Sequence, residues 1–284
     1  MYDTPTAWEQ CVIPAYGFQW ATDLVNDYVQ PGDRVLDLAC GTGIVARCAR
    51  HRMGNRGQVV GIDTSEEKIE LADLCEPSRV IWEVGNVERL PFRPAAFDVV
   101  LCQQGFQHFA DKRLALLEIR RVLREGGRLA MTVWRSAELM PVWAAVESVM
   151  RDIVGDPTFK LTPFAYDDPR ELKALVEEAG FVNVELHKET KTTRVNNWVE
   201  MVTIALIAYR GLLGGTSQFN EEQRKAFTIA IREALRGFED PDSKTIEFPQ
   251  VAHVVLAVGP PPPPPMSDEE IEEKVRIAIA GLRR

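Results

Sequence analysis

The sequence predicts an α/β fold with a Rossmann-like, doubly wound and mostly parallel sheet. Strand-like hydrophobic runs alternate with helix-like periods over residues 31–134, an alternation typical of parallel sheets. A glycine-rich turn, Gly41-Thr42-Gly43, directly follows the first run, as in nucleotide-binding α/β domains. The 284 residues suffice for one large domain with additions.

Five runs are predicted as strands of this sheet: residues 34–38, 58–63, 79–84, 97–102 and 128–134. Helices are predicted between them. The first spans residues 43–53, Thr64 begins the second with Glu67 completing a capping box, and Asp111 begins the third. Before the first strand, residues 8–29 are predicted as an irregular segment followed by a helix.

The second half of the chain is less regular. A helix at 170–179 precedes a strand at 182–189, and a mostly helical stretch at 196–238 is broken by Gly214-Gly215. The last strand lies within 246–258. Six prolines at 260–265 indicate a stiff spacer, and 267–284 have the apolar stripe of an amphipathic helix. We expect this helix either to dock on a second copy, giving a homodimer, or to remain a solvated tail.

The composition limits the classes of function. The net charge is −9, whereas nucleic-acid-binding proteins present basic surfaces, so no nucleic acid is expected as a partner. No apolar run has the length of a membrane span, and the N-terminus lacks a signal pattern, so a cytoplasmic location is expected. An odd number of cysteines without a Cys-x-x-Cys pair, and scattered histidines, indicate reduced thiols and no metal site.

Asp37 favours one ligand class for the glycine-rich turn. The turn alone suits a nicotinamide or flavin dinucleotide as well as S-adenosylmethionine (SAM). Asp37 lies near the end of the first strand, where its carboxylate would repel a pyrophosphate but attract the sulfonium and ammonium groups of SAM. The alternative is that Asp37 is a buried polar residue that bonds only the backbone of the turn.

Asp63 ends the second predicted strand. An acid at this place typically bonds both ribose hydroxyls of an adenosine, and it would repel the 2′-phosphate of NADP. The alternative is that Asp63 caps the helix that follows. Both roles are compatible.

These residues, with three downstream segments, resemble class I SAM-dependent methyltransferases, particularly the broad group that includes the ubiquinone- and menaquinone-biosynthesis methyltransferases. The segments are GNVERLPF at 85–92, FDVV at 97–100 and EIRRVLREGG at 118–127. The resemblance covers about residues 31–134. The family usually has Asp where this chain has Asn86, whose amide oxygen can accept the same hydrogen bond.

The resemblance implies seven strands, the last two antiparallel, and a helical insertion between them that forms a lid. It also implies that the chain is organised in four parts. Residues 1–30 are an N-terminal helical segment over the active site, 31–195 with 240–259 are the SAM-binding core, 196–239 are the helical cap, and 260–284 are the spacer and C-terminal helix.

The resemblance also implies contacts with SAM after four strands. Asn86 would accept from the adenine amino group, Val87 N–H would donate to the ring, and the backbone near Cys102 would hold the methionine end. The complete predicted set is Asp37, Ala39, Cys40, Gly41, Thr42, Gly43, Asp63, Thr64, Lys68, Gly85, Asn86, Val87, Cys102, Gln103 and Gln107.

The implied reaction is an in-line displacement at the methyl carbon of SAM, with S-adenosylhomocysteine as product. The protein then mainly orients the acceptor. His108 is the best-placed general base if the acceptor must lose a proton; alternatively it packs on the cofactor or caps a helix. Tyr16, Gln104 and His108 are expected to contact the substrate, with core packing as the alternative for Tyr16. Further aromatics are candidates for the acceptor pocket: Trp143, Phe164, Tyr166 and Trp198.

We therefore predict methyl transfer to a small, apolar or aromatic metabolite, such as a quinone-like compound, a polyketide or another secondary metabolite. Two alternatives remain open at this point. One is a nicotinamide-dependent oxidoreductase that shares the glycine-rich turn, and the other is a SAM-binding protein without catalysis.

Overall fold

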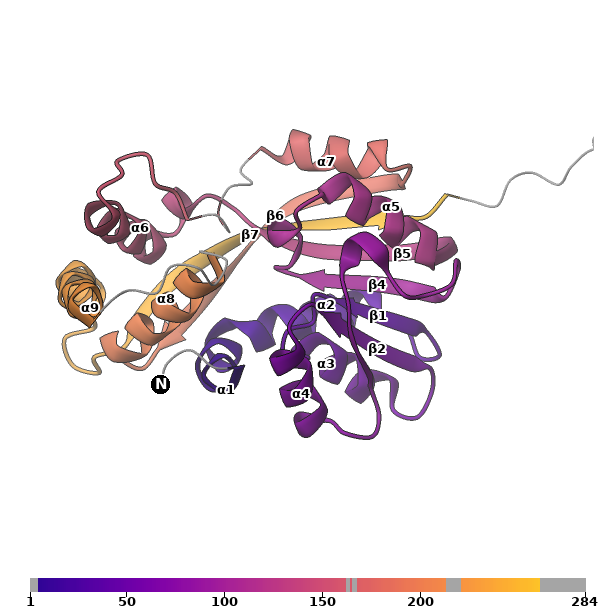
Figure 1. Ribbon diagram of the computed structural model, residues 1–284, viewed down its shortest axis with the longest axis horizontal. Helices are drawn as coiled ribbons and strands as arrows, with labels where there is room; N and C mark the ends of the chain where they lie inside the picture. The colour runs from indigo at the N-terminus through magenta and orange to yellow at the C-terminus, as the bar shows by residue number, and fades with distance from the viewer. Residues whose placement is uncertain (1–4, 162–163, 165–167, 213–220, 261–284) are drawn as a thin grey trace, which may run out of the picture.

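A seven-stranded sheet forms the centre of the computed structural model, which describes residues 5–161, 164, 168–212 and 221–260 (Figure 1). The strands lie in the order β3-β2-β1-β4-β5-β7-β6. Only β7 runs antiparallel to its neighbours, so the predicted fold class is confirmed. The strands are β1 (Arg34–Leu38), β2 (Gln58–Asp63), β3 (Ile81–Val84), β4 (Phe97–Gln103), β5 (Leu123–Trp134), β6 (Val182–Val195) and β7 (Ile246–Val258).

The strand order reverses beside β1. This strand pairs with β2 on one side and with β4 on the other, and both pairings are parallel. In open α/β sheets, such a reversal leaves a crevice at the carboxyl ends of the strands, where ligands bind. The glycine-rich turn follows the end of β1 and lies at this crevice.

Helices cover both faces of the sheet. α2 (Phe18–Tyr28) and α3 (Ile44–Met53) pack on the face that carries Val35, while α5 (Lys112–Val122) and α7 (Pro169–Glu178) pack on the face that carries Leu36. Side chains alternate along a strand, so Asp37 lies on the α2–α3 face. α4 (Glu66–Cys75) contacts β2 and β3.

A second apolar core holds a helical cap at the far ends of β6 and β7 (Figure 1). The two strands extend beyond β5, because the β5–β7 pairing stops at Trp134 and Ala252 whereas β6 and β7 pair as far as Val195 and Ile246. The cap consists of α6 (Pro141–Val154), α8 (Trp198–Leu212) and α9 (Glu221–Leu235). Val12, from the N-terminal segment, packs in the same core.

Several predicted boundaries are corrected by the structure. Ser65, not Thr64, caps α4: Asp63 accepts a hydrogen bond from Ser65 N–H at 3.0 Å, so the chain turns at Thr64 and the helix begins one residue later. Residues 8–17 are helical rather than irregular. They form a π-helix, η1 (Trp8–Gly17), which follows the short α1 (Pro5–Ala7) and contains Pro14.

One helix was not predicted at all. α6 lies between β5 and α7, so the cap draws on residues 135–168 as well as on the insertion between β6 and β7. The other differences are small: β3 begins at Ile81, and β6 runs six residues beyond its predicted end. Tyr166, Gly214-Gly215 and the predicted helix at 267–284 lie outside the described residues. Within the described part of the chain, no helix combines the length and apolarity needed to cross a membrane.

Candidate functional site

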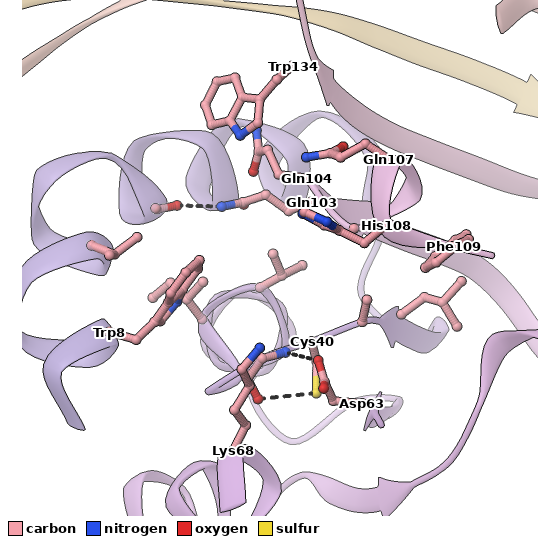
Figure 2. A pocket seen from close by; sticks show the side chains of 18 of the residues that line it. Trp8, Cys40, Asp63, Lys68, Gln103, Gln104, Gln107, His108, Phe109 and Trp134 are labelled. Carbon is pink, nitrogen blue, oxygen red and sulfur yellow. Dashed lines mark hydrogen bonds between the residues drawn. The ribbon is translucent and has the colours of Figure 1, made fainter. Parts of the chain in front are cut away.

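A cavity of about 500 Å³ lies at the crevice beside β1 and continues beneath the cap. One part of its wall comes from the loops that follow β1, β2, β3 and β4. The other part comes from η1, α6, α8 and β7. Figure 2 shows that side chains from several of these segments surround the same space.

Most of the predicted site residues line this cavity. They come from all four strand-end loops and from η1: Tyr16, Asp37, Ala39, Cys40, Gly41, Asp63, Thr64, Lys68, Gly85, Asn86, Val87, Gln103, Gln104, Gln107 and His108. Ala39 and Gln104, which follow the ends of β1 and β4, have φ values of 54° and 46°. Such strained backbone is concentrated at functional sites in proteins.

Three predicted residues do not line the cavity. Cys102 lies on the opposite face of β4 from Gln103 and is buried in the core beside α5. Gly43 donates its N–H to the Cys40 carbonyl at 2.9 Å, and the Trp82 ring occupies the space where its Cβ would stand. Thr42 is buried, and its hydroxyl donates a hydrogen bond to Glu9.

Asp37 is 1% exposed and bonds the first turn of α3, where Ala46 N–H donates to Oδ2 at 2.9 Å. Burial raises the pKa of Asp37 to about 8, and the negative charge of Asp63 acts in the same direction. Asp37 therefore makes a local backbone hydrogen bond, as in the alternative interpretation, and it also lines the cavity. Because the group is largely protonated at pH 7, a cation brought beside it would favour its ionised form.

Asp63 joins the loops that follow β1 and β2. Its Oδ2 accepts from Gly41 N–H at 2.9 Å and its Oδ1 accepts from Ser65 N–H at 3.0 Å. Each carboxylate oxygen can accept a second hydrogen bond. Since Asp63 also lines the cavity, its remaining lone pairs are available to hydroxyl groups of a ligand.

Glutamine amides converge on the cavity. Gln103 Nε2 donates to the Gly17 carbonyl at 2.9 Å, which leaves Oε1 without a partner (Figure 2). Gln104 Nε2 and both amide atoms of Gln107 and of Gln250 are also buried without a partner in the described structure. Gln250 was not predicted from the sequence, because it lies in a strand far along the chain from every motif.

His108 lines the cavity (Figure 2). Desolvation lowers the pKa of His108, and the positive charges of Lys68 and Lys112 lower it further. The imidazole is therefore neutral at pH 7, the form in which it can accept a proton. Lys68 Nζ also lies 5.5 Å from the ring centroid of Trp8, in a cation–π arrangement.

The cavity has a polar end and an apolar end. Its charged lining side chains and its lining histidine, among the described residues, belong to the strand ends and the segments that follow them: Asp37, Asp63, Lys68, Glu88 and His108. The lining beneath the cap is apolar, and its members are Trp143, Val146, Met150, Leu161, Phe164, Ala205 and Ile207.

The aromatic residues predicted to line the acceptor pocket do not all lie in the cavity. Trp143 and Phe164 line the cavity with their ring centroids 5.3 Å apart. Tyr16 meets Trp134 edge to face at 6.0 Å. Trp198 instead packs against the cap core beneath Arg232, so its predicted place in the pocket is corrected.

Residues 36–131, which contain the glycine-rich turn and the loop after β4, match the family described as Methyltransferase domain. Over 187 residues the chain is 29% identical to demethylmenaquinone methyltransferase of Staphylococcus aureus, a match that covers 60% of this chain and 77% of that protein. The chain is a class I SAM-dependent methyltransferase.

Solved structures share the fold of this methyltransferase. A protein of Bacillus halodurans C-125 described as a candidate methyltransferase matches with a TM-score of 0.57 at 21% identity, over 86% of this chain and 98% of that one. Phosphoethanolamine N-methyltransferase 2 of Haemonchus contortus, solved with phosphomonomethylethanolamine and S-adenosylhomocysteine, gives a TM-score of 0.53 at 18% identity. That match covers 86% of this chain and 53% of the other. At such identities the likeness shows the fold alone.

Glu9 ties the N-terminal segment of the methyltransferase to its glycine-rich turn. Its Oε2 accepts from Thr42 Oγ1 at 2.6 Å, and its Oε1 pairs with the guanidinium of Arg47 at 2.5 Å. Charge-assisted hydrogen bonds of this kind are stronger than neutral ones. They hold η1, and with it Trp8 and Tyr16, against the cavity.

Proposed function

We propose that this methyltransferase moves the methyl group of SAM onto a small, uncharged, apolar or aromatic metabolite bound beneath the cap. The observation that supports this proposal most directly is one continuous cavity, which has a polar end at the strand ends and an apolar end at the cap. A charged acceptor would lose its hydration at the apolar end without gaining a counter-charge, whereas an aromatic ring would bury its surface there. The name of the Staphylococcus aureus relative, demethylmenaquinone methyltransferase, supports the same acceptor class.

The polar end has the chemistry that SAM requires. The free lone pairs of Asp63 suit the ribose hydroxyls, and Asn86 with Val87 would contact the adenine. Asn86 Oδ1 already accepts from Glu88 N–H at 2.9 Å and retains one lone pair. Asp37 and the unpartnered Oε1 of Gln103 suit the cationic methionine end. The residues present therefore fit this methyl donor.

SAM supplies a methyl group already activated by its sulfonium, so the remaining task of the protein is orientation and, for some acceptors, proton removal. Correct orientation contributes up to about 7–11 kcal/mol in comparable reactions. In our proposal, Tyr16 and Gln104 hold the acceptor, and the neutral His108 takes its proton where the attacking group is a hydroxyl.

The proposal also assigns the parts of the chain. Residues 1–30 cover the site, 31–195 with 240–259 bind SAM, and 196–239, together with α6, enclose the acceptor. Docking of residues 267–284 on a second copy stays a prediction, as does a cytoplasmic location.

A panel of acceptors tests the proposed function directly. With SAM labelled in its methyl group, we expect transfer to uncharged phenols and quinols but not to phosphoethanolamine. Phe164→Ala removes one apolar wall contact, so the KM for a phenol should rise by about tenfold, while the Kd for S-adenosylhomocysteine stays unchanged. Transfer to the phosphorylated compound alone would contradict the proposal.

The raised pKa of Asp37 predicts proton release on SAM binding. In the ligand-free protein a pKa of about 8 keeps this carboxyl largely protonated at pH 7, and the stability it contributes is lost as the pH rises through 8. The cationic groups of SAM favour the ionised form, so affinity for SAM should rise with pH up to about 8. Calorimetry at pH 7 in buffers of different ionisation enthalpy should detect about one released proton.

Asp37→Asn is the matched control for this titration. The variant keeps the shape of the side chain but has no proton to release. It should bind SAM more weakly and with less proton release than the wild type. The same proton count in both proteins would show that Asp37 does not respond to the ligand.

His108→Gln tests the general base. With a phenolic acceptor at pH 7 we expect kcat to fall by about 10²-fold, because phenols ionise little on their own at this pH. The deficit should narrow toward pH 10, where the phenol loses its proton unaided, and the affinity for S-adenosylhomocysteine should not change. Full turnover of the variant at saturating acceptor would remove His108 from the mechanism.

A further inference from the structure

Gln250 lies where β7 leaves the main sheet and enters the cap. The β5–β7 pairing ends with Trp134 and Ala252, and Gln250 pairs only with Lys191 of β6. Because side chains alternate along a strand, Gln250 shares its face with Phe248 and Ala252. Phe248 belongs to the cap core, and Ala252 packs with Trp134. Gln250 thus stands between the cap and the aromatic wall of the cavity, which it lines.

The amide of Gln250 has no partner of its own in the described structure. The residue is 1% exposed, and neither Oε1 nor Nε2 makes a hydrogen bond. Lys191, directly opposite on β6, is engaged elsewhere: its ammonium pairs with Asp23 and Glu189 and lies 4.8 Å from the ring centroid of Trp20. A buried amide without a partner destabilises the folded protein, and native proteins keep few of them.

Gln107, on a different element, is also a buried glutamine whose amide has no partner in the described structure. It follows β4, is 4% exposed, and has both amide atoms unpartnered. In the view of Figure 2 its side chain appears in the same part of the pocket as Gln104 and Trp134, and Lys68 in another part. Gln107 and Gln250 both line the cavity: Gln107 follows β4, and Gln250 lies on β7 beside the apolar lining of the cap. A few polar groups in an apolar pocket orient the ligand and decide which ligands bind.

We infer that Gln250 forms a subsite for an uncharged carbonyl or hydroxyl group of the acceptor at the cap end of the cavity, and that Gln107, predicted above to contact SAM, offers a second amide to the acceptor from the loop after β4. The inference rests on the proposed function, because it concerns the acceptor of that reaction. A glutamine amide donates to a carbonyl and accepts from a hydroxyl, but it offers no charge to a phosphate or an ammonium. A site built to make such a bond discriminates strongly against a molecule of the same shape that lacks the oxygen.

Two probes of matched shape test this subsite. 2-Naphthol and 2-methylnaphthalene differ by a hydroxyl in place of a methyl group, and equilibrium dialysis against the full chain saturated with S-adenosylhomocysteine gives both Kd values. We expect the wild type to bind 2-naphthol at least about tenfold more tightly. Gln250→Met retains the length of the side chain without its polar atoms, and it should reduce the preference to about twofold or less.

Two control measurements accompany the probes. Gln58→Met alters an exposed glutamine at the start of β2 and should keep the full preference. Thermal unfolding should show that Gln250→Met does not lower the Tm, since the variant replaces an unpartnered amide by an apolar side chain. Gln107→Met should weaken the same preference independently.

Each outcome bears on a different statement. Equal binding of the two probes by the wild type, or an undiminished preference in Gln250→Met, overturns the subsite and leaves the proposed function standing. A Gln250→Met variant that unfolds at lower temperature and no longer binds S-adenosylhomocysteine assigns Gln250 a structural partner, which also overturns the subsite. Binding of neither probe by the wild type overturns the proposed acceptor class itself.

Discussion

The carboxylate of Asp63 holds the polar end of the cavity together. Its two oxygens fix Gly41 and Ser65, which belong to the loops after β1 and β2. Backbone bonds continue this connection: Cys40 N–H donates to the Ile62 carbonyl at 3.0 Å, and Gly85 N–H donates to the Asp63 carbonyl at 2.9 Å. The loops after three neighbouring strands therefore form one connected edge, and its shape is set before any ligand arrives. Preorganised polar groups of this kind bind without the cost of reordering.

The apolar end of the cavity depends on a different feature, the extension of β6 and β7 beyond the main sheet. The extension carries Gln250 and contacts α6 and α8, while α9 packs against α6 and α8 in the same apolar core. The N-terminal segment closes the remaining side and is fixed to the core by Glu9. The polar and apolar ends of the cavity thus come from separate parts of the fold, so under the proposed assignment a change in the cap would alter the acceptor without disturbing the binding of SAM.

The sequence predicted the sheet well, and most of the residues that it proposed for SAM line the cavity, because the signals for both are local. A strand, a glycine-rich turn and an acid at a strand end lie within a few residues of one another, so Asp37, Asp63 and the segment 85–92 can be recognised by pattern. Cys102 does not line the cavity, for a reason that the pattern contains: Leu101 and Gln103 share one face of β4, which leaves the Cys102 side chain facing α5. Gln250, Glu9 and the role of α6 could not be predicted, since each acts through contacts with residues far away in the sequence.

The binding of SAM by the Asp63 edge is the claim on which the other assignments depend. Calorimetric titration of S-adenosylhomocysteine into the wild type and into Asp63→Asn, with NAD as the comparison ligand, tests it most directly. We predict binding of S-adenosylhomocysteine by the wild type, affinity at least about tenfold weaker in the variant, and no binding of NAD. Binding of NAD in place of S-adenosylhomocysteine, or equal affinity in the wild type and the variant, would contradict it.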